Sequence, residues 1–135
     1  MNVTVTWKGK MKFIGEDENG HTVEMDTVAD VGGEDSAQSP KRLVLDGLAG
    51  CTGMDVIAIL RKMRALPESL RIEVEAEQTE THPKVFSKIH LRYIVKGNVP
   101  EEKLKKAIEL SQTKYCGVSE MLRKTARLTY EYLYE

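Results

Sequence analysis

The stretch from Leu43 to Leu60 constrains this chain more than any other, because apolar residues occur on nearly every side of the helix that it predicts. Ser39 and Pro40 mark the start of this helix, since serine supplies a capping oxygen and proline fits the first helical position. The predicted helix runs to about Arg64. A helix that is apolar all round must be surrounded by other elements. One three-stranded sheet cannot enclose it, so the pattern requires a second sheet or a second subunit.

The same stretch approaches the length of a membrane span. It contains Asp46 and Asp55, however, and carboxylates at bilayer depth are expensive. The first residues, Met1 to Trp7, lack the basic start and the apolar core of a signal peptide. We therefore expect a buried helix in a cytoplasmic protein with no membrane partner.

Three strands are expected before the helix. The alternation of apolar and polar residues places them at residues 1–7, 10–15 and 21–27. Asn19-Gly20 separates the last two, and it is a strong hairpin signal because both residues tolerate positive φ. The pattern predicts an antiparallel meander, followed by a loop from Asp30 to Gln38.

A second antiparallel pair is expected after Pro67. Apolar residues alternate with Arg and Glu over residues 70–77, which predicts a half-buried strand. The returning strand, residues 88–95, places four apolar side chains on one face: Ile89, Leu91, Tyr93 and Val95. Rows of Glu and of Lys or Arg then oppose each other across the hairpin, where they can form ion pairs.

The remaining pattern completes one domain. Helical spacing predicts a helix from about residue 98 to 115, and a shorter one from 118 to 124. Alternation over residues 128–134 predicts a last strand. The expected fold is a single α+β domain over residues 1–135, with antiparallel sheets and a long buried central helix.

Charge composition argues against one class of partner. Lys and Arg number 20 against 21 Asp and Glu, a net charge of -1. A nucleic-acid-binding surface needs a basic excess, so no nucleic-acid partner is expected. Structural disulfides are uncommon in the expected cytoplasmic compartment. The two cysteines are therefore expected to be reactive, or else simply buried.

Cys51 and Cys116 are the candidate catalytic residues. Each lies beside glycine, and small neighbours let a substrate approach the sulfur. A thiol becomes a useful nucleophile only as the thiolate, so its surroundings must stabilise the negative charge. The candidate stabilisers are backbone N–H groups near Gly50 and Gly117.

Side chains near the cysteines also bear on the thiolate. Lys41 and Arg42 are candidate thiolate-stabilising cations, if the fold brings them near. Asp55 and Glu120 each follow a cysteine by one helical turn. A carboxylate there opposes thiolate formation, unless it holds a cation in place or passes a proton.

A metal site is not expected from the spacing. Zinc ligands usually occur in close pairs such as Cys-x-x-Cys, and the chain has no such pair. The histidines fall in predicted turns or on strand faces and are expected at the surface: His21, His82 and His90. We therefore expect neither a metal nor a cofactor.

Two longer segments resemble motifs of the OsmC/Ohr family, which comprises osmotically inducible and organic hydroperoxide resistance proteins. Ser39 to Val56 resembles the central-helix motif of that family, and Lys114 to Ser119 resembles its second cysteine motif. The order of predicted elements agrees over essentially the whole chain. The resemblance is closest to the short YhfA-like branch of the family.

This resemblance implies an OsmC-like fold that forms an intertwined homodimer, with the long helices of two subunits packed between the sheets. It also implies a peroxidase (an antioxidant oxidoreductase of the stress response) that reduces organic hydroperoxides. Cys51 would be the peroxidatic thiol, and Cys116 would resolve its sulfenic acid as a disulfide. An external dithiol would then reduce that disulfide.

The sequence departs from the family at three places. Residues 1–38 contain no Arg, whereas peroxidase members carry one on their early strands. Lys41 and Arg42 stand where those members have a Glu, and Gly117 follows Cys116 where many have Pro. Two alternatives therefore stay open. One is a non-catalytic OsmC-like dimer that binds a small apolar ligand or senses redox state, and the other is a structural dimer with inert thiols.

Overall fold

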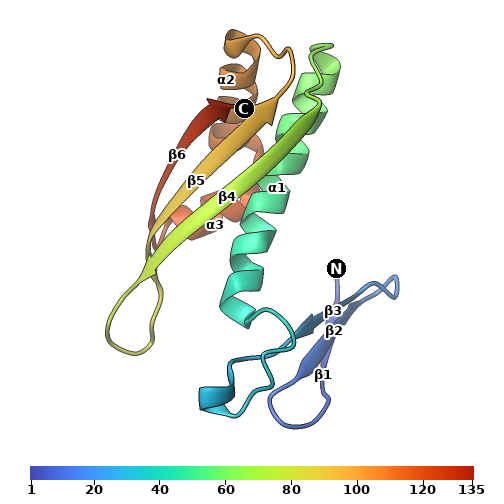
Figure 1. Cartoon of the computed structure of the whole chain (residues 1–135), viewed down its shortest axis with the longest axis vertical. Helices are drawn as coiled ribbons and strands as arrows, with labels where there is room; N and C mark the ends of the chain where they lie inside the picture. The colour runs from blue at the N-terminus through green and yellow to red at the C-terminus, as the bar shows by residue number, and fades with distance from the viewer. The chain divides into compact units, whose positions relative to one another are not determined.

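The computed structural model describes residues 1–135 and forms two compact units, Met1–Leu45 and Asp46–Glu135. Figure 1 shows the course of the chain. The elements in order are β1 (Val3–Trp7), β2 (Phe13–Asp17), β3 (Thr22–Met25), η1 (Ala29–Val31), α1 (Pro40–Lys62), β4 (Ser69–Gln78), β5 (Phe86–Lys96), α2 (Glu101–Leu110), η2 (Ser111–Tyr115), α3 (Gly117–Arg123) and β6 (Arg127–Tyr134). The single domain expected from the sequence stays a prediction.

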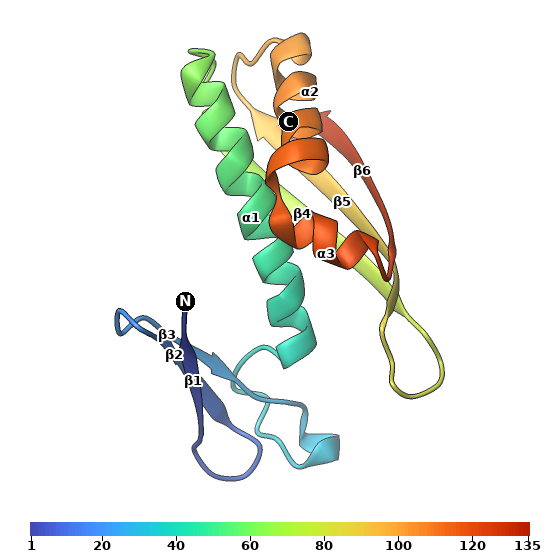
Figure 2. The same ribbon diagram turned by 180° about the vertical axis from the view of Figure 1, so that it is seen from behind.

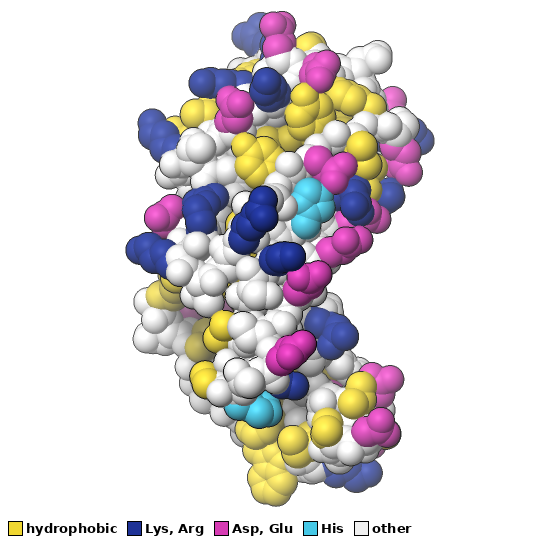
Figure 3. Space-filling view, turned by 90° about the vertical axis from the view of Figure 1, so that its left-hand side faces the viewer, with side chains coloured by type: hydrophobic (Ala, Val, Ile, Leu, Met, Phe, Trp, Pro, Cys, Tyr) yellow, Lys and Arg dark blue, Asp and Glu magenta, His cyan; other side chains and the backbone are white.

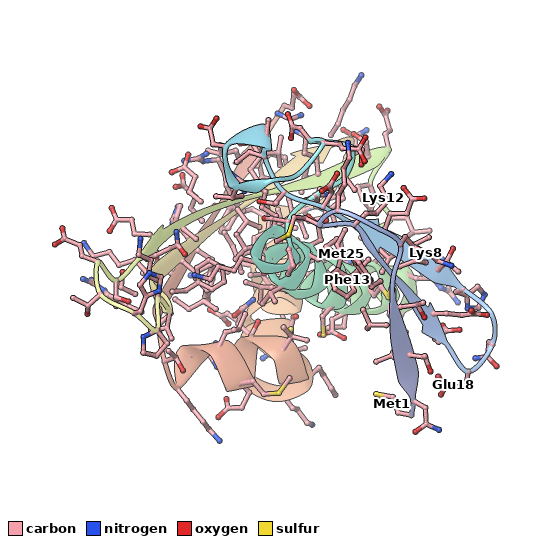
Figure 4. The ribbon with its side chains drawn as sticks, turned by 90° about the horizontal axis from the view of Figure 1, so that it is seen from below. Met1, Lys8, Lys12, Phe13, Glu18 and Met25 are labelled. Atoms are coloured by element: carbon pink, nitrogen blue, oxygen red, sulfur yellow. The ribbon has the colours of Figure 1, made fainter.

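The first unit contains the predicted antiparallel meander, in the order β1-β2-β3. Phe13 of β2 pairs with Met25 of β3, and the two side chains lie close together in Figure 4. β2 begins at Phe13, later than the sequence predicted, because a tight turn precedes it. Lys10 has φ 48°, and its carbonyl accepts a hydrogen bond from Trp7 Nε1 at 2.9 Å.

The loop after β3 is organised by one buried carboxylate. Asp26 is 2% exposed and accepts hydrogen bonds from the backbone N–H groups of Thr27, Glu34 and Ser36. The Ser36 hydroxyl donates a further one at 2.6 Å. These bonds, the one from the Ser36 hydroxyl first, lower the pKa of Asp26 from 3.8 to about 2. An ionised Asp26 therefore ties together the two ends of this loop.

We predict that Asp26→Asn opens this loop. The amide keeps the size of the carboxyl group but removes the charge that strengthens its hydrogen bonds. The amide protons of Glu34 and Ser36 should then exchange with solvent about tenfold faster, measured by NMR. Because the pKa is lowered on folding, the carboxylate stabilises the wild-type loop above its ordinary pKa of 3.8 and ceases to do so as the pH falls toward about 2. Asp30→Asn, an exposed acid in the same loop, is the control, and equal exchange in both variants would contradict the role of Asp26.

The long helix α1 is confirmed, with the predicted start. Ser39 Oγ accepts a hydrogen bond from the Arg42 backbone N–H at 3.4 Å. The helix ends where Arg64 adopts a left-handed φ of 56° and the Ala65 N–H bonds to the Leu60 carbonyl at 2.9 Å. Helices commonly end in such a left-handed residue, which satisfies the last carbonyls.

Burial of α1 follows a single stripe. By length and composition alone α1 is apolar enough to cross a membrane. Four of its residues, spaced every four positions, are nevertheless buried, which makes it a core helix: Leu48, Thr52, Val56 and Leu60. Other apolar side chains on α1 stay uncovered in the single chain, such as Met54 at 76% exposed. A single chain therefore supplies only part of the enclosure that the sequence requires for α1.

The second unit is a sheet covered by helices on one face. The strands lie in the order β4-β5-β6, and α2, α3 and the later part of α1 cover one side of them (Figures 1 and 2). The predicted inward face of β5 is confirmed, since its four apolar residues are at most 1% exposed: Ile89, Leu91, Tyr93 and Val95. These side chains form the centre of the core.

The outer face of this sheet is charged. Figure 3 shows acidic and basic side chains interspersed across it. Arg92 pairs with Glu73 at 3.3 Å, and Lys88 pairs with Glu77 at 3.6 Å, both between β4 and β5. The predicted ion pairing across the hairpin is therefore confirmed.

The last strand requires one correction to the expected antiparallel sheets. β6 pairs with β5 in parallel, with Tyr93 opposite Tyr132. The physical reason is the connection, since α2, η2 and α3 carry the chain back along the sheet before β6 begins. A crossover of this kind joins parallel strands, whereas a short turn joins antiparallel ones.

Candidate active site

The two cysteines lie in contrasting backbone settings within the second unit. Cys51 lies inside α1, where it is half-buried. Cys116 is 3% exposed and adopts an extended conformation, with φ -75° and ψ 99°, between η2 and α3. The π-helical turn η2 ends where the Cys116 N–H bonds to the Ser111 carbonyl at 2.8 Å. Such π-helical turns are frequent at functional sites.

The fold brings these cysteines together beside one carboxylate. The sulfur atoms of Cys51 and Cys116 and a carboxylate oxygen of Asp55 all lie within 4.8 Å of one another. Asp55 follows Cys51 by four residues on α1, which places both on the same helix face. The site is therefore a pair of free thiols with an acid at its edge.

Backbone N–H groups at the start of α3 act on both thiols. The Ser119 N–H donates to Cys116 Sγ at 3.3 Å. The Val118 N–H lowers the pKa of the Cys51 thiol. The predicted N–H stabilisation of Cys116 near Gly117 is thus confirmed. The prediction is wrong for Gly50, which lies inside α1 where backbone N–H groups are used by the helix.

The surroundings raise the pKa of the Cys51 thiol above its ordinary value. Burial is the largest cause, and the hydrogen bond with Cys116 is the second. The Val118 N–H opposes them, while the negative charges of Cys116 and Asp55 raise the pKa further. The predicted opposition of Asp55 to thiolate formation is therefore confirmed.

We predict that Asp55→Asn makes the Cys51 thiol more reactive near neutral pH. Removing the negative charge lowers the pKa of Cys51, so a larger fraction is thiolate. Alkylation by iodoacetamide, followed by peptide mass spectrometry at Cys51, should become several-fold faster, and its pH profile should shift toward lower pH. Glu120→Gln removes a carboxylate one turn after Cys116 and is the control. Slower alkylation in Asp55→Asn would show instead that Asp55 takes the proton from the thiol.

A buried network of hydroxyl groups holds Asp55. Ser111 Oγ donates to Asp55 Oδ2 at 2.9 Å and lies 2.7 Å from Thr52 Oγ1. Thr52 Oγ1 lies in turn 2.7 Å from the Tyr93 hydroxyl. Thr52, Tyr93 and Ser111 are all 0% exposed. A satisfied network of this kind is rigid, so it fixes the carboxylate beside the thiols.

The network continues away from the thiols to an arginine. Gln112 Nε2 donates to the Tyr93 hydroxyl at 2.9 Å, and Arg123 donates to Gln112 Oε1 at 3.1 Å. Arg123 also pairs with Glu120 at 3.1 Å. Glu120 thus holds an arginine in place, which is one of the two uses predicted for a carboxylate after a cysteine.

The predicted cations lie in the other unit of the chain. Lys41 and Arg42 belong to the first turn of α1, and Arg42 Nη1 donates to Ser39 Oγ at 3.2 Å. The groups that shift the pKa of Cys51 include neither of them. Their role in stabilising a thiolate stays a prediction.

Sequence reasoning missed Ser111 as part of the site. The sequence placed it only within the predicted helix from about residue 98 to 115, and nothing in the local pattern shows which buried group its hydroxyl meets. Asp55 carried a usable signal, because residues four apart share a helix face.

An apolar groove of about 690 Å³ runs between α1 and β4. Its α1 wall is built from small and apolar residues, among them Gly50, Gly53 and Met54. A Cβ atom on Gly53 would lie 3.1 Å from Ile72 Cδ1, so glycine permits the close approach of β4. Neither cysteine lines the groove, which is therefore separate from the thiol pair.

Comparisons with known proteins agree with this fold. The sequence profile of OsmC-like proteins matches residues 33–131. Protein YhfA of Escherichia coli K12 is 34% identical over 98% of this chain and 96% of its own length. A hypothetical protein from Aquifex aeolicus VF5 has a similar structure, with TM-score 0.82, 27% identity, and coverage of 99% of this chain and 96% of its own.

The chain belongs to the OsmC-like family. Its resemblance to that family, seen in the sequence motifs, is therefore confirmed. The organic hydroperoxide resistance protein OhrB of Bacillus subtilis shares the fold, with TM-score 0.71 over 98% of each chain, at 16% identity.

Proposed function

We propose that this protein is a thiol-dependent peroxidase that reduces organic hydroperoxides in defence against oxidative stress. The observation that carries the proposal is the approach of the Cys51 and Cys116 sulfur atoms to within 4.8 Å. A disulfide needs an S–S distance of about 2.05 Å, so a modest shift of the chain closes the bond. Membership of a family whose structural neighbours include hydroperoxide resistance proteins adds support.

Each step follows from the positions of the two thiols. The Cys51 thiolate attacks the distal peroxide oxygen, the O–O bond breaks, and the leaving alkoxide takes a proton to become the alcohol. Cys51 is then a sulfenic acid. The Cys116 thiolate attacks the Cys51 sulfur, forms the disulfide and releases hydroxide, which is protonated to water. An external dithiol restores both thiols by exchange.

Cys51 is assigned the peroxidatic role because a peroxide needs access. Cys51 is half-buried, whereas Cys116 is 3% exposed. Cys116 lies at the join between η2 and α3, where a small backbone movement would bring its sulfur to the sulfenic acid.

The test counts thiols and measures intact mass before and after one molar equivalent of cumene hydroperoxide. Rapid loss of both thiols, with the mass change of one disulfide, is expected. The same experiment with hydrogen peroxide should run more slowly if the substrate is organic. Two thiols unchanged under excess cumene hydroperoxide would exclude the peroxidase.

A second candidate is a non-catalytic dimer that binds a small apolar ligand or senses redox state. The raised pKa of Cys51 favours it, because a protonated thiol reacts slowly with peroxide. The apolar groove of about 690 Å³ offers space for such a ligand. Slow thiol oxidation together with saturable binding of an apolar fluorescent probe would favour this function.

We further propose that the working form is the homodimer that is typical of OsmC-like proteins. The apolar side chain of Met54 on α1 is 76% exposed. A Cβ added at Gly50 meets nothing within 4 Å, so this part of α1 is open to a second backbone. A second copy packed here would complete the enclosure of α1. The proposed compartment of this dimer is the cytoplasm.

We predict that Met54→Arg weakens this dimer. An unpaired charge buried in an apolar interface costs about 3 kcal/mol or more, which raises the Kd of the dimer more than about a hundredfold. Size-exclusion chromatography with light scattering should give twice the chain mass for the wild type and the single mass for Met54→Arg at micromolar concentration. Thr113→Arg, at an exposed site on η2, is the control and should stay dimeric. A dimeric Met54→Arg would place the interface elsewhere.

A further inference from the structure

The site contains three groups of the kind that bind zinc. Cys51 and Cys116 supply thiol sulfur atoms, and Asp55 supplies a carboxylate oxygen, all within 4.8 Å of one another. Cys51 and Asp55 lie one helical turn apart on α1, and Cys116 reaches them from the break before α3. The three groups therefore approach one point from two directions.

Their separation suits a shared cation. Zinc binds thiolate sulfur at about 2.3 Å and carboxylate oxygen at about 2.0–2.2 Å. Two ligands of one tetrahedral zinc ion therefore stand about 3.5–3.8 Å apart. The observed upper limit of 4.8 Å requires a closing movement of about 1 Å. Rotation of the side chains supplies such a movement.

Two of the candidate ligands are already held by hydrogen-bond donors. The Ser119 N–H donates to Cys116 Sγ at 3.3 Å. The Ser111 hydroxyl donates to Asp55 Oδ2 at 2.9 Å. Donors behind the ligand atoms orient them and tune the metal, and they are a regular part of protein zinc sites.

We propose that the reduced protein binds one Zn²⁺ ion per chain through Cys51, Cys116 and Asp55. Two thiolates with one carboxylate favour zinc over Mg²⁺ or Ca²⁺, which prefer oxygen ligands alone. Three protein ligands leave the fourth tetrahedral position to water or a small ligand. The disulfide form lacks both thiolates and does not bind the ion. The sequence predicted no metal site because it lacks a close pair of cysteines. In the structure Cys116 joins Cys51 and Asp55 from a segment that is distant in the sequence.

The test uses Co²⁺ as a spectroscopic stand-in for Zn²⁺ on untagged, reduced protein. One equivalent per chain should produce sulfur-to-cobalt charge-transfer absorption and tetrahedral ligand-field bands, and Zn²⁺ should abolish both by displacement. Protein oxidised to the disulfide with diamide should produce neither. Absence of charge-transfer absorption in the reduced wild type, or octahedral bands alone, would overturn the proposal.

Variants identify the ligands. Cys51→Ser, Cys116→Ser and Asp55→Asn should each weaken Zn²⁺ binding by more than the roughly 10- to 100-fold typical of losing a supporting hydrogen bond. Glu80→Gln, which changes an exposed acid in the loop between β4 and β5, is the control and should bind as the wild type does. Circular dichroism verifies that each variant is folded, and equal Zn²⁺ affinity in Cys116→Ser would exclude the site.

The test of the zinc site is independent of the test of peroxidase activity. Thiol oxidation by cumene hydroperoxide is measured on metal-free protein in chelator, so peroxidase activity without Zn²⁺ binding refutes only the metal site. Zn²⁺ binding without thiol oxidation refutes only the peroxidase.

Discussion

Cys51→Ser is expected to abolish the reduction of organic hydroperoxides, with the rate falling on the order of a thousandfold or more. The hydroxyl of serine has no accessible anion near neutral pH and cannot accept the peroxide oxygen as sulfur does. The measurement is consumption of cumene hydroperoxide in the presence of excess dithiothreitol, followed for the wild type and the variant at equal folded concentration.

Cys116→Ser is the matched variant, because it removes the other thiol of the pair. Cys51 should still react once with peroxide, but the product should stop at the sulfenic acid, which dimedone captures as a mass-shifted adduct. Dimedone labelling of Cys51 in this variant, and none in Cys51→Ser, would establish the order of the two roles. Full activity in Cys51→Ser would contradict the assignment.

Leu60→Ala is expected to lower the free energy of unfolding by about 2–5 kcal/mol. Leu60 is 0% exposed at the end of the buried stripe of α1. Truncation removes apolar contacts and leaves a cavity that the surrounding core fills only in part. Urea unfolding followed by circular dichroism, at one fixed protein concentration, measures the change.

Met121→Ala on α3 is the control, since Met121 is 65% exposed. Its free energy of unfolding should stay within about 0.5 kcal/mol of the wild-type value. If Leu60→Ala unfolds at the same urea concentration as this control, the stripe on α1 does not form the core.

Local patterns predicted the inward and outward faces of the second sheet. Ile89 and Leu91 alternate with charged residues, and a strand turns successive side chains to opposite faces whatever its neighbours are. The start of α1 was predictable for the same reason, because the capping by Ser39 involves only residues within one turn. These features depend on the backbone of a few adjacent residues.

The direction of β6 was not predictable from its own residues. Alternation over residues 127–134 is the same in a parallel and an antiparallel strand. The path of α2, η2 and α3 decides the direction, because it returns the chain to the opposite end of the sheet before β6 begins.

The sequence by itself determined the buried helix, the two sheets, the two cysteines as candidates, and the opposition of Asp55 to the thiolate, which follows from their spacing of four residues. Only the tertiary structure decided that Cys116 meets Cys51 and that Ser111 holds Asp55. Cys51 and Cys116 are separated by a hairpin and a helix, so their contact depends on how α1 and η2 pack against the same sheet. Packing of this kind is a property of the whole core, and no local pattern records it.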